Sequence, residues 1–131
     1  MNELAKEILD TVEVGALATV NVDRTPLVTP LHFARLGDSI IWISEPTARH
    51  SENAFRNGKA EFVVWDDKKR AVFLKTNVTE LPESEKEVAM AAYKDKLADF
   101  MPRCQNPQIY VAPIGELDEK TTTGNWLHFI A

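Results

Sequence analysis

Residues 27–56 read LVTPLHFARLGDSIIWISEPTARHSENAFR and decide how this chain is expected to fold. Two apolar runs, LVTPLHF and SIIWIS, are separated by a short segment with the turn-forming LGD, which predicts two successive strands. The apolar pattern then stops, and TARHSENAFRNG is typical of a short helix with Thr47 as its N-cap and Gly58 as its left-handed stop. Arg49 and His50 therefore stand just after a strand end.

The place of this basic pair favours two interpretations. The first turn of a helix carries backbone N–H groups without intrahelical partners and the positive end of the helix dipole, so it attracts phosphate. A guanidinium such as that of Arg49 can add two parallel hydrogen bonds to the same phosphate. The pair is either the edge of an anion-binding site or a surface feature without a ligand, and spacing alone leaves both open. If the two strands pair through the LGD turn, Thr29 and Ser44 can offer hydroxyls to one planar ligand.

Composition limits the class of protein. The 131 residues predict one domain, 1–131, and 20 acidic against 15 basic side chains (net charge −5) argue against nucleic-acid binding, which needs clustered Lys and Arg. The three histidines are far apart and neither HExxH nor CxxC occurs, so no metal site is expected. With Cys104 as its one cysteine, no signal-peptide core and no apolar run of membrane-spanning length, the chain is expected to be cytoplasmic, without a membrane partner.

The rest of the chain is expected to form short strands joined by tight turns, with few helices. Leu4, Ile8 and Val12 repeat at helical spacing after the possible N-cap Asn2, and Gly15 is the expected end of this helix. ALATVNV is expected to form a hairpin with LVTPLHF. The other expected elements are strands 59–66 and 70–81, a helix at 82–101 with Val88, Ala91, Ala92 and Leu97 on its apolar face, and a strand within 108–120. This order favours a mainly β fold that closes into a small barrel.

The succession from Gly15 to Trp65 resembles the pyridoxamine 5'-phosphate oxidase family, specifically its small FMN-binding split-barrel members. In that family a strand of the type LATV, a turn, a strand ending in P-x-x-F, an aromatic-rich strand ending in Ser or Thr, and an SRK-like element before N-x-x-x-N recur in this order. The resemblance implies a six-stranded antiparallel split barrel that forms a homodimer, with two FMN sites at the dimer interface.

Carried over position by position, the resemblance also implies which side chains hold the cofactor. Four line the flavin from one strand, one meets it from the next strand, a basic pair holds the phosphate, and a last one contacts the flavin from the other subunit. In that order, these residues are Thr29, Pro30, Leu31 and His32, then Ser44, then Arg49 and His50, and finally Arg70.

Departures from the family pattern bear on the activity. Its oxidase members carry Lys where His50 and His32 stand and an Arg near Leu27, and they have a C-terminal segment with Trp and Arg that binds pyridoxal phosphate. We therefore expect an FMN-dependent oxidoreductase that acts on an unidentified small molecule, and not a true pyridoxamine 5'-phosphate oxidase. Two alternatives stay open: a non-catalytic module that binds or stores flavin, haem or a deazaflavin, and a structural dimer with a degenerate pocket.

Overall fold

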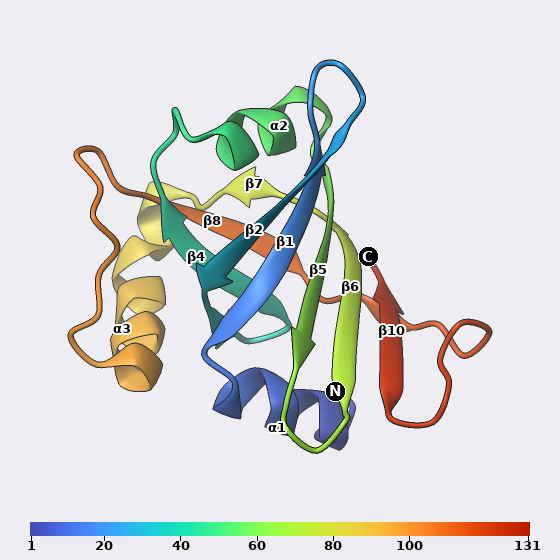
Figure 1. The fold of residues 1–131 in the computed structure, drawn as a ribbon. Helices are drawn as coiled ribbons and strands as arrows, with labels where there is room; N and C mark the ends of the chain where they lie inside the picture. Colours follow the sequence, from blue (N-terminus) through green and yellow to red (C-terminus); the bar gives the residue numbers. More distant parts are fainter.

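The computed structural model describes residues 1–131, which are mainly strands with three α-helices (Figure 1). The helices are α1 (Glu3–Thr11), α2 (Arg49–Asn57) and α3 (Lys86–Leu97), with a 3-10 turn η1 (Glu83–Glu85) before α3. The strands are β1 (Val14–Val20), β2 (Pro26–His32), β3 (Ala34–Leu36), β4 (Ser39–Ser44), β5 (Lys59–Trp65), β6 (Ala71–Asn77), β7 (Thr79–Glu80), β8 (Gln108–Pro113), β9 (Glu116–Leu117) and β10 (Trp126–Ile130). None of the helices is both long and apolar enough to span a membrane. The expected mainly β fold is confirmed.

The strands form two sheets, ordered β2-β1-β5-β6-β10-β9 and β3-β4-β8-β7. Every strand pair is antiparallel except β6 with β10, which run parallel with Ala71 opposite Trp126. The chain leaves the larger sheet after β6, builds α3 and β8, and returns beside β6, and such a long crossover permits a parallel pair. The split-barrel class is thus confirmed, whereas the detail of six purely antiparallel strands is corrected.

The runs LVTPLHF and SIIWIS lie in different sheets. β2 pairs with β1 along its whole length, as expected for the first hairpin. The next residue, Phe33, is fully buried, and the chain then enters the smaller sheet, where β4 pairs with β3 and β8. The pairing of the two runs through the LGD turn therefore does not occur, because that turn joins β3 to β4.

β4 is buried on both faces, as its continuous apolar run indicates. Ile40 and Trp42 belong to the main core inside the barrel, together with residues of the larger sheet and α1. Ile41 and Ile43 form a second cluster with one face of α3. On α3, Leu97 is buried as expected but Val88 is 63% exposed, because the buried face contains Ala89 and Tyr93 instead.

The ends of two helices differ from expectation. Asn2 caps α1 by accepting a hydrogen bond from the amide of Ala5, as predicted, but the helix ends before Gly15, which lies inside β1. A Cβ on Gly15 would overlap the Phe62 ring, so this glycine is required by packing and does not stop a helix. The N-cap of α2 is Ala48 and not Thr47, whereas Gly58 takes the expected left-handed conformation after it, with φ of 75°.

Candidate functional site

The α2 helix covers one end of the barrel, directly after β4 (Figure 1). Its N-cap, Ala48, has no side chain that can bond the free amides of the first turn. Arg49 and His50 occupy that first turn, and the buried side of the helix contains Ser51, Asn53 and Ala54. The fold therefore places the basic pair where amides and helix dipole both favour an anion.

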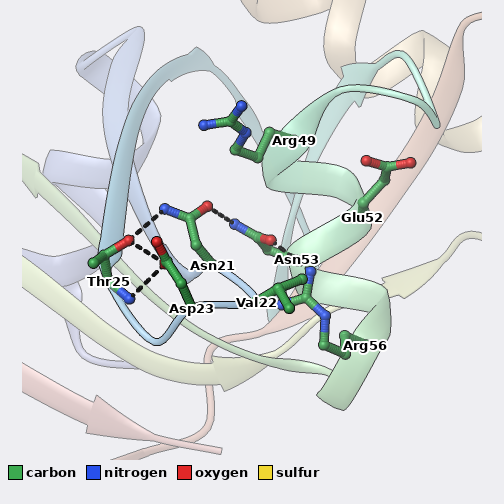
Figure 2. A pocket seen from close by; sticks show the side chains of 8 residues that line it. All are labelled: Asn21, Val22, Asp23, Thr25, Arg49, Glu52, Asn53 and Arg56. Carbon is green, nitrogen blue, oxygen red and sulfur yellow. Dashed lines mark hydrogen bonds between the residues drawn. The ribbon is translucent and has the colours of Figure 1, made fainter.

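An open polar groove of about 480 Å³ lies between α2 and the turn from β1 to β2 (Figure 2). Its walls are almost entirely polar: Asn21, Asp23, Thr25, Arg49, Glu52, Asn53 and Arg56, with Val22 as the apolar exception. Two guanidinium groups and two carboxylates face the same space. The groove thus suits a polar, charged ligand group and not an apolar one.

Asn53 holds this groove together. It is 3% exposed and donates from Nδ2 to Thr19 Oγ1 at 3.2 Å and to Asn21 Oδ1 at 2.9 Å. Its Oδ1 accepts from Arg56 at 2.9 Å, and Arg56 also donates to the carbonyl of Val20 at 2.9 Å. Arg56 is therefore committed to joining α2 to β1.

Arg49 differs from Arg56, because its guanidinium has no hydrogen bond or ion pair within the chain (Figure 2). The nearby Asp23 is bonded to Thr25 through the side-chain hydroxyl and the amide, and these bonds lower the pKa of the Asp23 carboxyl, with a smaller contribution from the charge of Arg49. Arg49 is thus an exposed cation with all its donors available, beside one fixed negative charge.

His50 points away from the groove toward β4. Its Nε2 lies 2.9 Å from Ser44 Oγ, and Ser44 is 5% exposed. Burial lowers the pKa of His50 from its usual 6.5, so the imidazole is neutral at pH 7. The structure brings these two predicted residues together, and Arg49 carries the charge of the basic pair.

The four predicted residues of β2 are divided between two faces of the larger sheet. Residues directly opposite each other on paired strands share a face. Thr29 is opposite Leu17, which is fully buried, so Thr29 and also Leu31 face the barrel interior. Pro30 and His32 face outward, and the His32 ring stacks on Phe100 with 3.9 Å between centroids.

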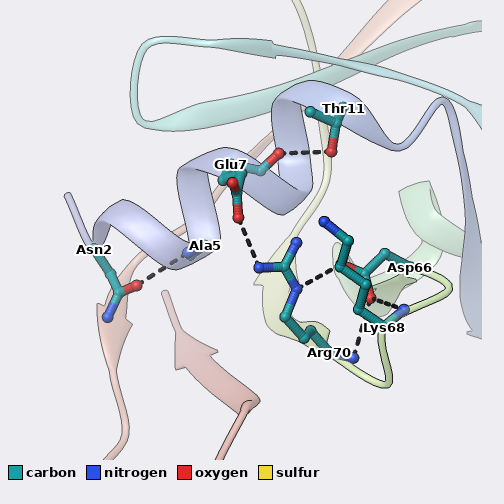
Figure 3. A network of polar contacts seen from close by, with 7 residues as sticks. All are labelled: Asn2, Ala5, Glu7, Thr11, Asp66, Lys68 and Arg70. Atoms are coloured by element: carbon teal, nitrogen blue, oxygen red, sulfur yellow. Dashed lines mark hydrogen bonds and ion pairs between the residues drawn. The ribbon is translucent and has the colours of Figure 1, made fainter.

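Arg70 lies at the other end of the larger sheet, beside α1 (Figure 3). It donates to Glu7 at 2.8 Å and to Asp66 at 2.7 Å. Burial opposes ionisation of Asp66, but hydrogen bonds from Arg70 and from the amides of Lys68 and Arg70 outweigh it and lower the pKa of the carboxyl. Within one chain, Arg70 is bound to two carboxylates and is separated from the other predicted residues.

The sequence interpretation missed Asn21, Asn53 and Arg56. Asn53 and Arg56 stand three residues apart in the predicted helix, on one face of it, which is a signal that could have been read. No comparable signal links them to Asn21, since 32 residues separate Asn21 from Asn53. Only the packing of α2 on the β1–β2 hairpin makes them neighbours.

A comparison with protein families identifies the class of this protein. The family described as pyridoxamine 5'-phosphate oxidase matches residues 1–115, so the chain belongs to this family. A comparison with curated proteins found no match. The family assignment agrees with the split-barrel fold and places residues 29–50 within the matched region.

Solved structures confirm the fold. A haem-binding protein from Mycobacterium smegmatis superposes with a TM-score of 0.72 at 21% identity, covering 86% of this chain and 50% of that protein. A FAD-binding protein from Mesorhizobium loti gives 0.68 at 21% identity over 88% of this chain and 91% of that one. An F420 reductase gives 0.67 at 19% identity, with 82% and 90% covered. This chain spans half the length of the mycobacterial protein, and identities this low show the fold alone.

Proposed function

We propose that this chain is a single FMN-binding domain that works as a homodimeric flavoprotein oxidoreductase on a small molecule. The observation that carries the proposal is the unpartnered guanidinium of Arg49 at the first turn of α2, in a polar groove. Membership of the pyridoxamine 5'-phosphate oxidase family supports it. A phosphate there gains charge-assisted hydrogen bonds, worth about 1.5–3 kcal/mol each.

The residues present fit such a cofactor at its phosphate end. Arg49 would supply the positive charge and the free amides of α2 the remaining donors, while the neutral His50 and Ser44 would contribute hydrogen bonds only. Thr29, Pro30, Leu31 and His32 on β2 are proposed to line the flavin. Arg70 belongs to this proposal as a residue of a second protomer.

When bound, FMN supplies hydride or electron transfer. The protein's part is to position it, to exclude water and to set the hydrogen bonds around it. Ser44 holds the imidazole of His50 in place, and Asn53 holds α2 against the β1–β2 turn, so the two sides of the phosphate end keep a fixed geometry.

The phosphate assignment is tested with Arg49→Ala and two ligands that differ by one phosphate. We expect the affinity for FMN to fall about tenfold or more, because at least one charge-assisted hydrogen bond is lost, and the affinity for riboflavin to stay unchanged. Flavin fluorescence quenching measures both. Lys6→Ala removes the same charge from the surface of α1 and serves as the control. Equal losses for both ligands would remove the phosphate role, and failure of the wild-type protein to bind FMN would remove the proposal.

The outer face of the larger sheet supports a homodimer. Trp65 and Trp126 are 56% and 55% exposed, and Val28 and Ile130 are 63% and 45% exposed on the same face. Phe73 lies beside Trp126, with ring centroids 6.0 Å apart. Apolar surface of this extent on one sheet face is typical of an interface.

Light scattering coupled to size-exclusion chromatography tests whether the protein is a dimer. Wild-type protein is expected to elute with twice the mass of the chain, and Trp126→Ser is expected to weaken the dimer. Val88→Ser, on the exposed side of α3, is the control and should leave the mass unchanged. A monomeric wild type would remove the shared site and with it the proposed role of Arg70.

The alternative function is binding or storage without turnover. Structural similarity to proteins described as binding or storing haem supports this alternative. Anaerobic reduction of the flavin-loaded protein by a nicotinamide nucleotide supports the oxidoreductase. Tight haem binding without flavin binding supports the alternative.

A further inference from the structure

The segment 98–107, here called the strap, connects α3 to β8, and its hydrogen bonds lie near its two ends. At the end of α3, the amide of Ala98 donates to the carbonyl of Lys94 and the amide of Phe100 to the carbonyl of Leu97. At the other end, the carboxylate of Glu45 accepts hydrogen bonds from the amides of Gln105 and Asn106. The backbone of residues 101–104 makes no backbone hydrogen bond between these two points. Such a segment can move without breaking strand or helix structure.

Phe100, near the start of the strap, covers the outward face of His32. The two ring centroids are 3.9 Å apart and the planes differ by 30°. Phe100 is nevertheless 41% exposed, and its neighbour Met101 is 42% exposed. The ring is therefore not held in a core. Its main aromatic contact is the one with His32.

The strap leaves α3 through a strained residue. Ala98 has φ of 54° and ψ of −125°, a conformation that glycine adopts readily and alanine does not. The hydrogen bond of its amide to Lys94 holds this conformation. Movement of the strap that releases Ala98 would relieve this strain. The strain therefore destabilises the conformation in which Phe100 stacks on His32.

We propose that Phe100 is a gate residue, which occupies the stacking position on His32 and must leave before a planar ligand ring can take it. The inference rests on the proposed function, because it assumes that a planar ring binds along β2. Two rings cannot stack on the same imidazole face, so the ligand competes with Phe100. The apparent dissociation constant is then the intrinsic one divided by the open fraction.

Because Phe100 competes with the ligand, its removal is predicted to raise the affinity for flavin. Removal of a residue that contacts the bound ligand would lower that affinity. Phe100→Ala is expected to tighten binding of riboflavin and FMN alike, by about threefold or more, since it removes the closed state. Phe100→Leu keeps apolar bulk without a flat ring, so its flavin affinity should lie between those of wild type and Phe100→Ala. Met101→Ala is the matched control, because Met101 is equally exposed on the same strap and should leave both affinities unchanged.

Ala98→Gly provides a test of opposite sign. Glycine relieves the strain of the closed strap, so the closed state becomes more populated and both flavins should bind more weakly than to wild type. Thermal denaturation of each variant checks that the fold is retained. Loss of the ring-current shift of the His32 ring protons in the NMR spectrum of Phe100→Ala verifies the stack directly.

The outcomes separate the gate from the proposed function. If wild type binds FMN and Phe100→Ala binds it equally or more weakly, Phe100 is no gate, although the flavoprotein proposal stands. If Met101→Ala tightens binding as much as Phe100→Ala, the effect arises from any substitution in the strap, and the specific role of Phe100 as a gate is refuted. If neither wild type nor Phe100→Ala binds any flavin, both proposals fail.

Discussion

The two ends of the larger sheet each present an arginine, and the two arginines have opposite surroundings. Arg49, at the α2 end, has no partner within the chain and faces a polar groove. Arg70, at the α1 end, is bound by Glu7 and Asp66 (Figure 3). The same side chain is thus available for a ligand at one end and used for structure at the other.

This difference shows that partners decide whether an arginine is available to a ligand. The family resemblance of the sequence predicts both Arg49 and Arg70 as cofactor-binding residues. At the α2 end the network around Asn53 satisfies Arg56 and leaves Arg49 free. At the α1 end no donor other than Arg70 neutralises both carboxylates.

The buried network at the α2 end should contribute most to stability. Asn53→Ala takes the amide donor away from the buried Thr19 hydroxyl and from Asn21 Oδ1, and it removes one of the two hydrogen bonds of Arg56, which keeps the bond to the Val20 carbonyl. A buried polar group left unsatisfied costs about 1–3 kcal/mol. Urea denaturation measures the free energy of unfolding. Glu52→Ala, an exposed side chain on the same helix, is the control. A change of similar size in both variants would contradict the central role of Asn53.

The second prediction compares the stability of two variants, in each of which one of the two arginines is replaced by alanine. Arg49→Ala should leave the free energy of unfolding within about 0.5 kcal/mol of wild type, because the side chain is exposed and unpaired. Arg70→Ala should lower the midpoint of thermal denaturation, since Glu7 and Asp66 lose their common partner. If Arg49→Ala destabilised the protein more than Arg70→Ala, the assignment of one end to binding and the other to structure would be reversed.

Acid should act on the two ends in different pH ranges. The pKa of His50 is lowered by burial, so the unfolded chain takes up a proton first, and stability falls as the pH drops below 6.5. The pKa of Asp66 lies below 3.8, so the contribution of the α1 end is lost only at still lower pH. His50→Gln, whose amide can still reach Ser44, should flatten the first decline and leave the second. Melting temperatures across the pH range measure both declines, and an unchanged slope just below pH 6.5 would contradict this role of His50.

The smallest expected effect concerns the negative charge beside Arg49. Asp23→Asn keeps an oxygen that can accept from Thr25 but removes the charge that opposes a phosphate. FMN affinity should rise about twofold at low salt, with the difference shrinking at high salt, as for other exposed charges. Riboflavin, titrated in parallel, should be unaffected. A loss of FMN affinity would show that Asp23 itself contacts the ligand.

Local patterns predicted the elements that depend on neighbours in sequence. The α1 cap at Asn2, the β1–β2 hairpin and the doubly buried β4 are confirmed, because capping, turn residues and apolar runs act over a few positions. The expected apolar face of α3 is wrong at Val88 and Ala91, which are exposed, because the helix turns the side that contains Ala89, Tyr93 and Leu97 inward.

Sequence by itself determined the family, the mainly β class and the placing of a basic pair at the start of a helix after a strand. The tertiary structure decided which members of that pair and of β2 can act together. It turned Arg49 to a groove and His50 to Ser44, put Pro30 on the face opposite Thr29, and bound Arg70 to α1. The reason is physical: strand alternation and helix packing direct each side chain, and a guanidinium is available to a ligand only where folding gives it no hydrogen-bonded partner.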